Sequence, residues 1–189
     1  MAKKDKKELR KNANYDSGVI DENIADACKG YMRIFGANNN LMRHLPEVFD
    51  GLKIGERRIL YTMYRMGLGY NKPTIKVKNI VGNTMMYHPH GDAAIEDTLV
   101  KMAQPWANIQ QFIDGKGNFG SAAGDVAASG RYTEARLSFY SYKCFFEEFS
   151  PDIVNMRDNY LGNDIEPEYL PAKYPNALIN TSFGKIHAL

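Results

Sequence analysis

The sequence has few of the residues that build disulfide frameworks and metal sites. Its 189 residues include two cysteines, Cys28 and Cys144, and four histidines. Neither cysteine has metal-ligating residues beside it at zinc-site spacing, so a disulfide-rich secreted scaffold and a cysteine-based zinc site are excluded. Such a chain suits a reducing compartment, and we expect a cytoplasmic protein.

Long apolar runs and a strong charge imbalance are missing as well. A transmembrane helix needs about 18 consecutive apolar residues, and no stretch of the sequence has them. The first residues also lack the apolar core of a signal peptide, so we expect no membrane partner. The composition, 44% hydrophobic and 24% charged, is that of an ordinary globular protein with enough length for a real core. A net charge of +2 is too small to indicate nucleic-acid binding, which must be judged from where the cations lie.

Helical periodicity dominates the first half of the chain. Residues 1–18 are rich in lysine and poor in large apolar side chains, which predicts a solvated or disordered arm. Apolar residues at helical spacing then predict a helix within residues 19–44 that breaks near residues 36–40.

Three short helices are expected next, in a helix-turn-helix arrangement. Residues 56–66 form the first, and a segment that includes Ile75 and ends before residue 87 forms the second. The third follows Asp92 as its N-cap and ends at Pro105. Further on, aromatic residues spaced three and four apart predict a buried helix from Ala135 to about residue 150. Residues 159–174 read as loop, and residues 177–179 as a short strand.

One tyrosine is a candidate nucleophile. Tyr132 follows Arg131 directly, after a glycine-rich approach over residues 114–124 whose permissive backbone suits close contact with another molecule. A phenol is a poor nucleophile at its ordinary pKa of about 10 and needs a positioned cation or base, for which Arg131 is the nearest candidate. The chain has twelve tyrosines, however, and from spacing alone a packed tyrosine at the start of a helix is the simpler interpretation.

Two other segments have more than one interpretation. The run from His88 to Asp92 has the His-x-His-x-Asp spacing of metal-dependent hydrolases, but such a site needs more ligands. Its two imidazoles instead precede a helix N-terminus, where they could hydrogen-bond phosphate oxygens. Arg57 and Arg58, with Lys53, could grip a phosphate backbone, although a solvent-exposed helix end would have the same sequence.

Six motifs in a fixed order resemble one family, over a span from about Leu45 to Asn180. They are Asp50-Gly51-Leu52-Lys53, Arg57-Arg58, His88-Pro89-His90-Gly91-Asp92, Met102-Ala103-Gln104-Pro105, Gly115-Lys116-Gly117-Asn118-Phe119-Gly120-Ser121 and Arg131-Tyr132-Thr133-Glu134. The set resembles the breakage-reunion part of the A subunits of bacterial DNA gyrase and topoisomerase IV, the type IIA DNA topoisomerases.

The resemblance implies a mainly α fold with a small β part (α+β), a winged-helix (helix-turn-helix) DNA-gate domain with the start of a tower region. The expected parts are the arm at residues 1–18, the winged-helix DNA cleavage domain at residues 19–150 and the start of the tower domain, truncated, at residues 151–189. The family's later gate and DNA-wrapping parts would lie beyond, so the chain is expected to be a fragment or a truncated homologue.

The resemblance also implies a reaction, catalysed by an isomerase, the ATP-hydrolysing type II topoisomerase. By position in the motif, Tyr132 attacks a DNA phosphodiester, which forms a 5′-phosphotyrosyl link, frees a 3′-hydroxyl and lets a second duplex pass. Arg131 would stabilise the charge growing on the scissile phosphate. The implied DNA contacts are Lys53, Arg57, Arg58, His88, His90 and Lys101, and Ile186 is a weaker candidate for the DNA-bending residue.

The implied partners are double-stranded DNA, a B subunit, plus a second A subunit, in an A2B2 assembly in the bacterial cytosol or nucleoid. The B subunit would hold Mg²⁺ and hydrolyse ATP, so no metal ligand is expected in this chain, which should not cleave DNA alone. Two positions would touch quinolone drugs. Ala93 stands where the family commonly has serine, and Asp97 matches its acidic residue, so we expect a poor quinolone response. The alternative from another class is a non-catalytic winged-helix DNA-binding remnant.

Overall fold

The computed structural model describes residues 22–180, apart from the side chain of Met42, and divides the chain into two compact units. The first unit ends at Leu41 and contains helix α2, Ile24–Asn39, whose first turn is capped by the Asn23 side chain. The α-helix ends at Asn39, within the break predicted near residues 36–40, and the chain continues as the π-helical turn η1, Asn40–His44. The predicted arm at residues 1–18 and Ile186 lie outside the described residues.

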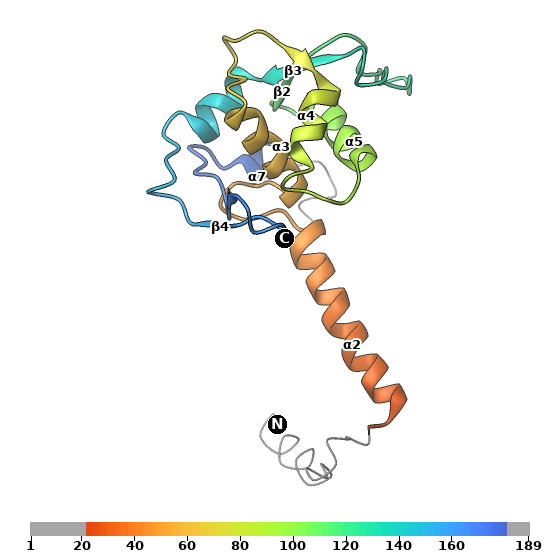
Figure 1. The fold of residues 1–189 in the computed structure, drawn as a ribbon. Helices are drawn as coiled ribbons and strands as arrows, with labels where there is room; N and C mark the ends of the chain where they lie inside the picture. The colour runs from red at the N-terminus through yellow and green to blue at the C-terminus, as the bar shows by residue number, and fades with distance from the viewer. Residues whose placement is uncertain (1–21, 181–189) are drawn as a thin grey trace. The chain divides into compact units, whose positions relative to one another are not determined.

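The second unit is built on three helices that pack against one another, which confirms the helices predicted there (Figure 1). They are α3, Ile54–Arg65, α4, Val77–Thr84, and α5, Asp92–Ala103. Each buries an apolar face at helical spacing, which in α5 consists of Ile95, Leu99, Met102 and Ala103. Asp92 is the first residue of α5 and not its N-cap. That position belongs to Gly91, whose φ of 100° is one that glycine adopts readily.

A small antiparallel sheet lies at one end of these helices (Figure 1). Its order is β1, Ile75–Lys76, then β3, Glu134–Leu137, then β2, Ile113–Lys116. Ile75, predicted within the second helix, is therefore in a strand. The fold is helix-rich with small antiparallel sheets, as expected for a winged-helix domain, and the predicted α+β class is confirmed.

The aromatic segment after β3 is only partly helical. Ala135, predicted to begin a helix, lies in β3. Alternate residues of β3 are buried, and Ala135 is paired with Ile75 of β1 on one side and with Gly115 of β2 on the other. Helical backbone begins at α6, Phe139–Ser141, and continues as the π-helical turn η2, Tyr142–Phe146. Phe145 and Phe146 are buried in the core cluster, as the spacing predicted, but Phe139 is exposed.

The last described residues form two elements that the sequence did not predict. A hairpin of β4, Met156–Asp158, and β5, Ile165–Pro167, falls partly in the expected loop. Residues 177–179 belong to helix α7, Asn176–Ile179, and not to a strand. The Asn180 N–H donates to the Asn176 carbonyl, which is a helical hydrogen bond, and the Asn176 side-chain amide donates to the Asp50 carbonyl. Where the cleavage domain ends and a tower domain begins stays a prediction.

Candidate active site

The segment from Ser129 to Thr133, which we term the nucleophile loop, leads from the glycine-rich stretch into β3. Its backbone is held on both sides. The Val77 N–H donates to the Thr133 carbonyl at 3.0 Å, and the Lys78 N–H donates to the Gly130 carbonyl at 3.1 Å. The start of α4 therefore fixes the chain on either side of Arg131 and Tyr132.

The Glu96 carboxylate of α5 also holds the nucleophile loop. The Gly130 N–H donates to Glu96 Oε1 at 2.7 Å, and Lys78 Nζ lies 2.7 Å from Glu96 Oε2. Burial alone would raise the pKa of Glu96, but the hydrogen bonds from Lys78 and the Gly130 N–H outweigh it and hold this pKa below its usual range. Nothing in the sequence indicated this role for Glu96.

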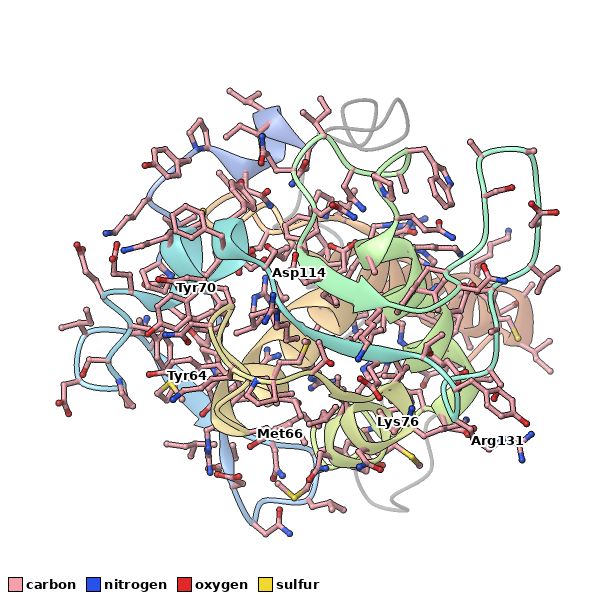
Figure 2. All side chains as sticks on the ribbon, turned by 90° about the horizontal axis from the view of Figure 1, so that it is seen from above. Tyr64, Met66, Tyr70, Lys76, Asp114 and Arg131 are labelled. Atoms are coloured by element: carbon pink, nitrogen blue, oxygen red, sulfur yellow. The ribbon has the colours of Figure 1, made fainter. Side chains whose placement is uncertain are left out.

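Tyr132 itself projects from the loop and is 69% exposed. The guanidinium carbon of Arg131 lies 5.5 Å from the centre of the Tyr132 ring, within the range of a cation–π contact. Arg131 is also exposed, and Figure 2 shows it at the outer edge of the domain with its side chain directed away from the ribbon. The structure thus brings the two predicted catalytic side chains together on the surface, where a phosphate group could reach both.

Four of the six predicted DNA contacts lie in one groove of about 480 Å³. Lys53, His88, His90 and Lys101 line it, together with Arg43, and we term this set of five residues the histidine groove. Arg43 was not among the predicted contacts, and its Nη2 lies 3.4 Å from Nε2 of His90. The groove has three basic lining residues against one acidic residue, Glu56, and it lies between the start of α3, the turn before α5 and α5 itself.

The two predicted arginines do not line this groove. Arg57 is buried, and its Nε and Nη2 donate to the two carboxylate oxygens of Asp50 at 2.6 and 3.1 Å. Asp50 is fully buried and also accepts the N–H groups of Leu52 and Leu170. Because both partners are inside the protein, Arg57 has a structural role here in place of the predicted surface contact.

Arg58 lies directly behind the groove. Its Nε and Nη2 donate to Glu166 at 2.6 and 2.7 Å, and its Nη1 donates to Nδ1 of His88 at 3.0 Å. Burial is the largest cause, and together with the nearby Arg58, His90 and Arg43 it lowers the pKa of His88 to about 4. His88 is therefore a neutral imidazole at neutral pH.

The His-x-His-x-Asp segment does not form a metal site. Among residues 22–180, no three His, Cys, Asp or Glu side chains converge as metal ligands would. His88 faces Arg58, His90 faces Arg43, and Asp92 Oδ2 accepts from Lys78 Nζ at 3.0 Å. Each of the three groups has a cationic neighbour, so the hydrolase hypothesis has no support.

Comparison with known proteins agrees with the six ordered motifs. A model of the family described as the A subunit of DNA gyrase/topoisomerase IV matches residues 43–185. The chain belongs to this family of DNA gyrase and topoisomerase IV A subunits. It is 43% identical to the DNA gyrase A subunit of Rickettsia typhi over 171 residues, which is 90% of this chain and 19% of that protein. It is 42% identical to that of Streptococcus pyogenes over 170 residues, 89% of this chain and 20% of that protein.

The chain thus spans about a fifth of the length of these two gyrase relatives. The family match begins at Arg43, so it includes every member of the nucleophile loop and of the histidine groove. In the described part of the chain, no helix is both long and apolar enough to cross a lipid bilayer.

The two expected drug positions lie on α5, beside the nucleophile loop. Ala93 and Asp97 line a groove of about 480 Å³ whose other wall includes residues 125–129. Asp97 accepts from Lys101 Nζ at 2.6 Å across one helical turn. Ala93 therefore lines the same groove as residues 125–129, which lead directly to Arg131 and Tyr132.

Proposed function

We propose that the chain is the DNA-gate segment of a type II topoisomerase A subunit, in which Tyr132 is the nucleophile. The observation that carries this proposal is the exposed Tyr132 ring beside the Arg131 guanidinium, on a loop whose backbone is fixed by α4 and α5. Family membership supports the same role.

In the proposed reaction, the Tyr132 phenol oxygen forms a bond to a DNA phosphorus as the bond from that phosphorus to the 3′-oxygen breaks. The phenol proton leaves, the 3′-oxygen becomes a hydroxyl, and resealing is the reverse transfer. Arg131 donates to the phosphate oxygens, whose negative charge grows in the transition state. The bond energy is kept in the phosphotyrosine link, so strand resealing needs no separate source of energy.

The histidine groove is proposed to bind the DNA backbone near the cleavage point. Lys53, Lys101 and Arg43 supply positive charge for phosphates, and His88 and His90 supply hydrogen bonds. Arg57 and Arg58 are not part of this proposed contact, because their guanidinium groups bind Asp50 and Glu166.

The remaining parts of the enzyme are proposed to come from partners. A B subunit would supply Mg²⁺, which stabilises charge on the scissile phosphate, and the ATPase that drives strand passage. A second A subunit would cut the opposite strand in an A2B2 assembly. These assignments rest on the family alone.

The test is a covalent adduct between the protein and DNA. The chain is mixed with a gyrase B subunit, Mg²⁺ and supercoiled DNA, the reaction is stopped with denaturant, and 5′ ends are examined for attached protein. Tyr132→Phe should abolish the adduct and spare DNA binding. Tyr160→Phe is the matched control, because Tyr160 is also exposed, at 73%.

Each result has a clear meaning. An adduct that persists in Tyr132→Phe would reject this nucleophile, and an adduct without the B subunit would reject the proposed division of labour. Duplex binding by every variant with no adduct under any condition would favour the non-catalytic DNA-binding alternative.

A further inference from the structure

We infer that Glu166 is a positioning residue for the histidine groove: through Arg58, it fixes His88 as the tautomer that carries its proton on Nε2. This inference deepens the proposed DNA contact of His88 and rests on that function only for the role of the groove. The fixation of the ring itself follows from contacts inside the free protein.

The first step is the hydrogen-bond polarity at His88 Nδ1. A guanidinium group has donors and no acceptor, so an Nδ1 atom 3.0 Å from Arg58 Nη1 must present its lone pair. A neutral imidazole has one proton, which then has to be on Nε2. A doubly protonated ring would point an N–H at a cationic donor, and this contact would be repulsive.

The second step is what holds Arg58 in place. Glu166 is buried, at 2% exposure, and binds Arg58 through both carboxylate oxygens in a two-pronged arrangement. Arg157 adds a second cation, with its Nη2 3.0 Å from Glu166 Oε1. A bidentate carboxylate fixes the plane of a guanidinium group, and that plane aims Nη1 at His88.

The third step is the consequence for the groove. His88 lines the groove, and its only donor in this tautomer is the Nε2–H. This donor suits an acceptor such as a phosphate oxygen and does not suit a metal ion, which needs a nitrogen lone pair. His90 has the opposite arrangement, because its Nε2 faces the Arg43 donor. The two neighbouring rings therefore offer different atoms to a ligand.

The decisive measurement is made without DNA. Long-range proton–nitrogen spectra of the ¹⁵N-labelled 189-residue chain at neutral pH resolve the ring nitrogens of its four histidines. The His88→Asn variant identifies the His88 signals by their loss. The expected result is a protonated Nε2 and an unprotonated Nδ1. A proton on Nδ1, on both nitrogens, or divided between them in the unaltered chain would overturn the inference.

Variants then test whether Glu166 is responsible. Glu166→Gln should convert His88 to a mixture of tautomers, because Arg58 loses its bidentate partner. Glu168→Gln makes the same change at an exposed glutamate two residues away and should leave the His88 signals as they were. If Glu166→Gln does not fold, Arg58→Met removes the donor directly and should give the same mixture. An unchanged His88 pattern in a folded variant would contradict the role of Glu166.

Duplex binding separates positioning from general stability. His88→Ala should weaken binding of a short duplex by about 10-fold, and Glu166→Gln should weaken it by a smaller factor. In the His88→Ala background, Glu166→Gln should have no further effect, because the two changes act through one ring. Equal losses in both backgrounds would show that Glu166 acts otherwise. Absence of DNA binding would reject the proposed function, while the ring spectra still decide this inference.

Discussion

The two halves of the candidate active site are held in place by different kinds of contact. The nucleophile loop is fixed largely through its backbone, by Val77, Lys78 and Glu96, and the side chains of Arg131 and Tyr132, which we propose as catalytic, are exposed. The histidine groove instead rests on side chains, with the buried pairs of Asp50 with Arg57 and Glu166 with Arg58 beneath it. Backbone fixation leaves Arg131 and Tyr132 able to adjust to a substrate, whereas buried charges fix the imidazole of His88 before any ligand arrives.

The largest expected effect follows from breaking the buried charges. Asp50→Ala leaves Arg57 as an unpaired buried cation and removes the acceptor of the Leu52 and Leu170 N–H groups. Loss of one partner of such a pair lowers the free energy of unfolding by about 3–5 kcal/mol. Urea unfolding of Asp50→Ala and of the unaltered chain measures this loss of free energy. Asp97→Ala, which breaks only the exposed pair with Lys101, should change stability by less than about 0.5 kcal/mol. Similar losses in the two variants would refute the contrast.

A smaller loss is expected where the nucleophile loop meets its support. A Cβ on Gly130 would lie 3.0 Å from both Glu96 Oε1 and Val77 Cγ1, so Gly130→Ala must displace the loop or the carboxylate. Overpacking of this kind lowers the free energy of unfolding by about 1–3 kcal/mol. Tyr132 should also lose its position, which the covalent adduct assay detects.

The matched control for Gly130→Ala is a glycine in open space. Gly82 lies within α4, and a Cβ there would meet nothing within 4 Å. Gly82→Ala should raise the free energy of unfolding by about 0.5–1 kcal/mol, because alanine has the higher helix propensity. A Gly130→Ala protein as stable as the Gly82→Ala protein would show that the loop is not tightly held.

The sequence predicted the helices that carry the site far better than the contacts that hold it. Apolar spacing was enough for α3, α4 and α5, since each turns one buried face to the core. Apolar spacing failed at Ala135. The aromatic residues that follow at intervals of three and four do not show whether the residues before Phe139 form a strand or a helix. A two-residue strand such as β1 is too short to leave any alternation.

The site residues were found by motif and their environments were not. Arg57 and Arg58 look like adjacent surface cations in the sequence. Their partners lie seven residues before Arg57, at Asp50, and 108 residues after Arg58, at Glu166. No local pattern indicates a pair of that separation. Glu96 was equally hidden, because its partner Gly130 lies 34 residues further along and bonds through its backbone.

A pH effect of about 1 kcal/mol is expected from His88. Its pKa is about 4 in the folded chain and about 6.5 in an unfolded one, so between these values the unfolded state binds more protons. Stability should therefore fall as the pH drops from about 6.5 to 4, with no further loss from this group below that. The half-buried ring limits the size of the effect.

The charged groups around His88 set the direction of this change. Arg58, Arg43 and His90 disfavour its protonation, and Glu166 favours it more weakly. Urea unfolding at neutral and mildly acidic pH measures the slope. His88→Asn keeps an acceptor for Arg58 and does not titrate, so its stability should depend less on pH over this window. An equal slope in His88→Asn and the unaltered chain would mean that other groups are responsible.

The smallest effect concerns an exposed member of the histidine groove. Lys101→Ala should leave stability almost unchanged, since the pair with Asp97 is solvent-exposed. Duplex binding should weaken uniformly across DNA sequences, and the slope of log affinity against log salt should become shallower by about 1, as for one lost phosphate contact. Lys72→Ala removes an exposed lysine that does not line the groove and should leave the slope unchanged. If both variants lower the slope equally, the chain binds DNA through its general charge, and the groove is not the contact surface. If Lys101→Ala alone makes the slope shallower, the groove is the contact surface. Lys101 then attracts the DNA phosphates by its charge, and the fixed His88 ring donates a directed hydrogen bond to the same backbone.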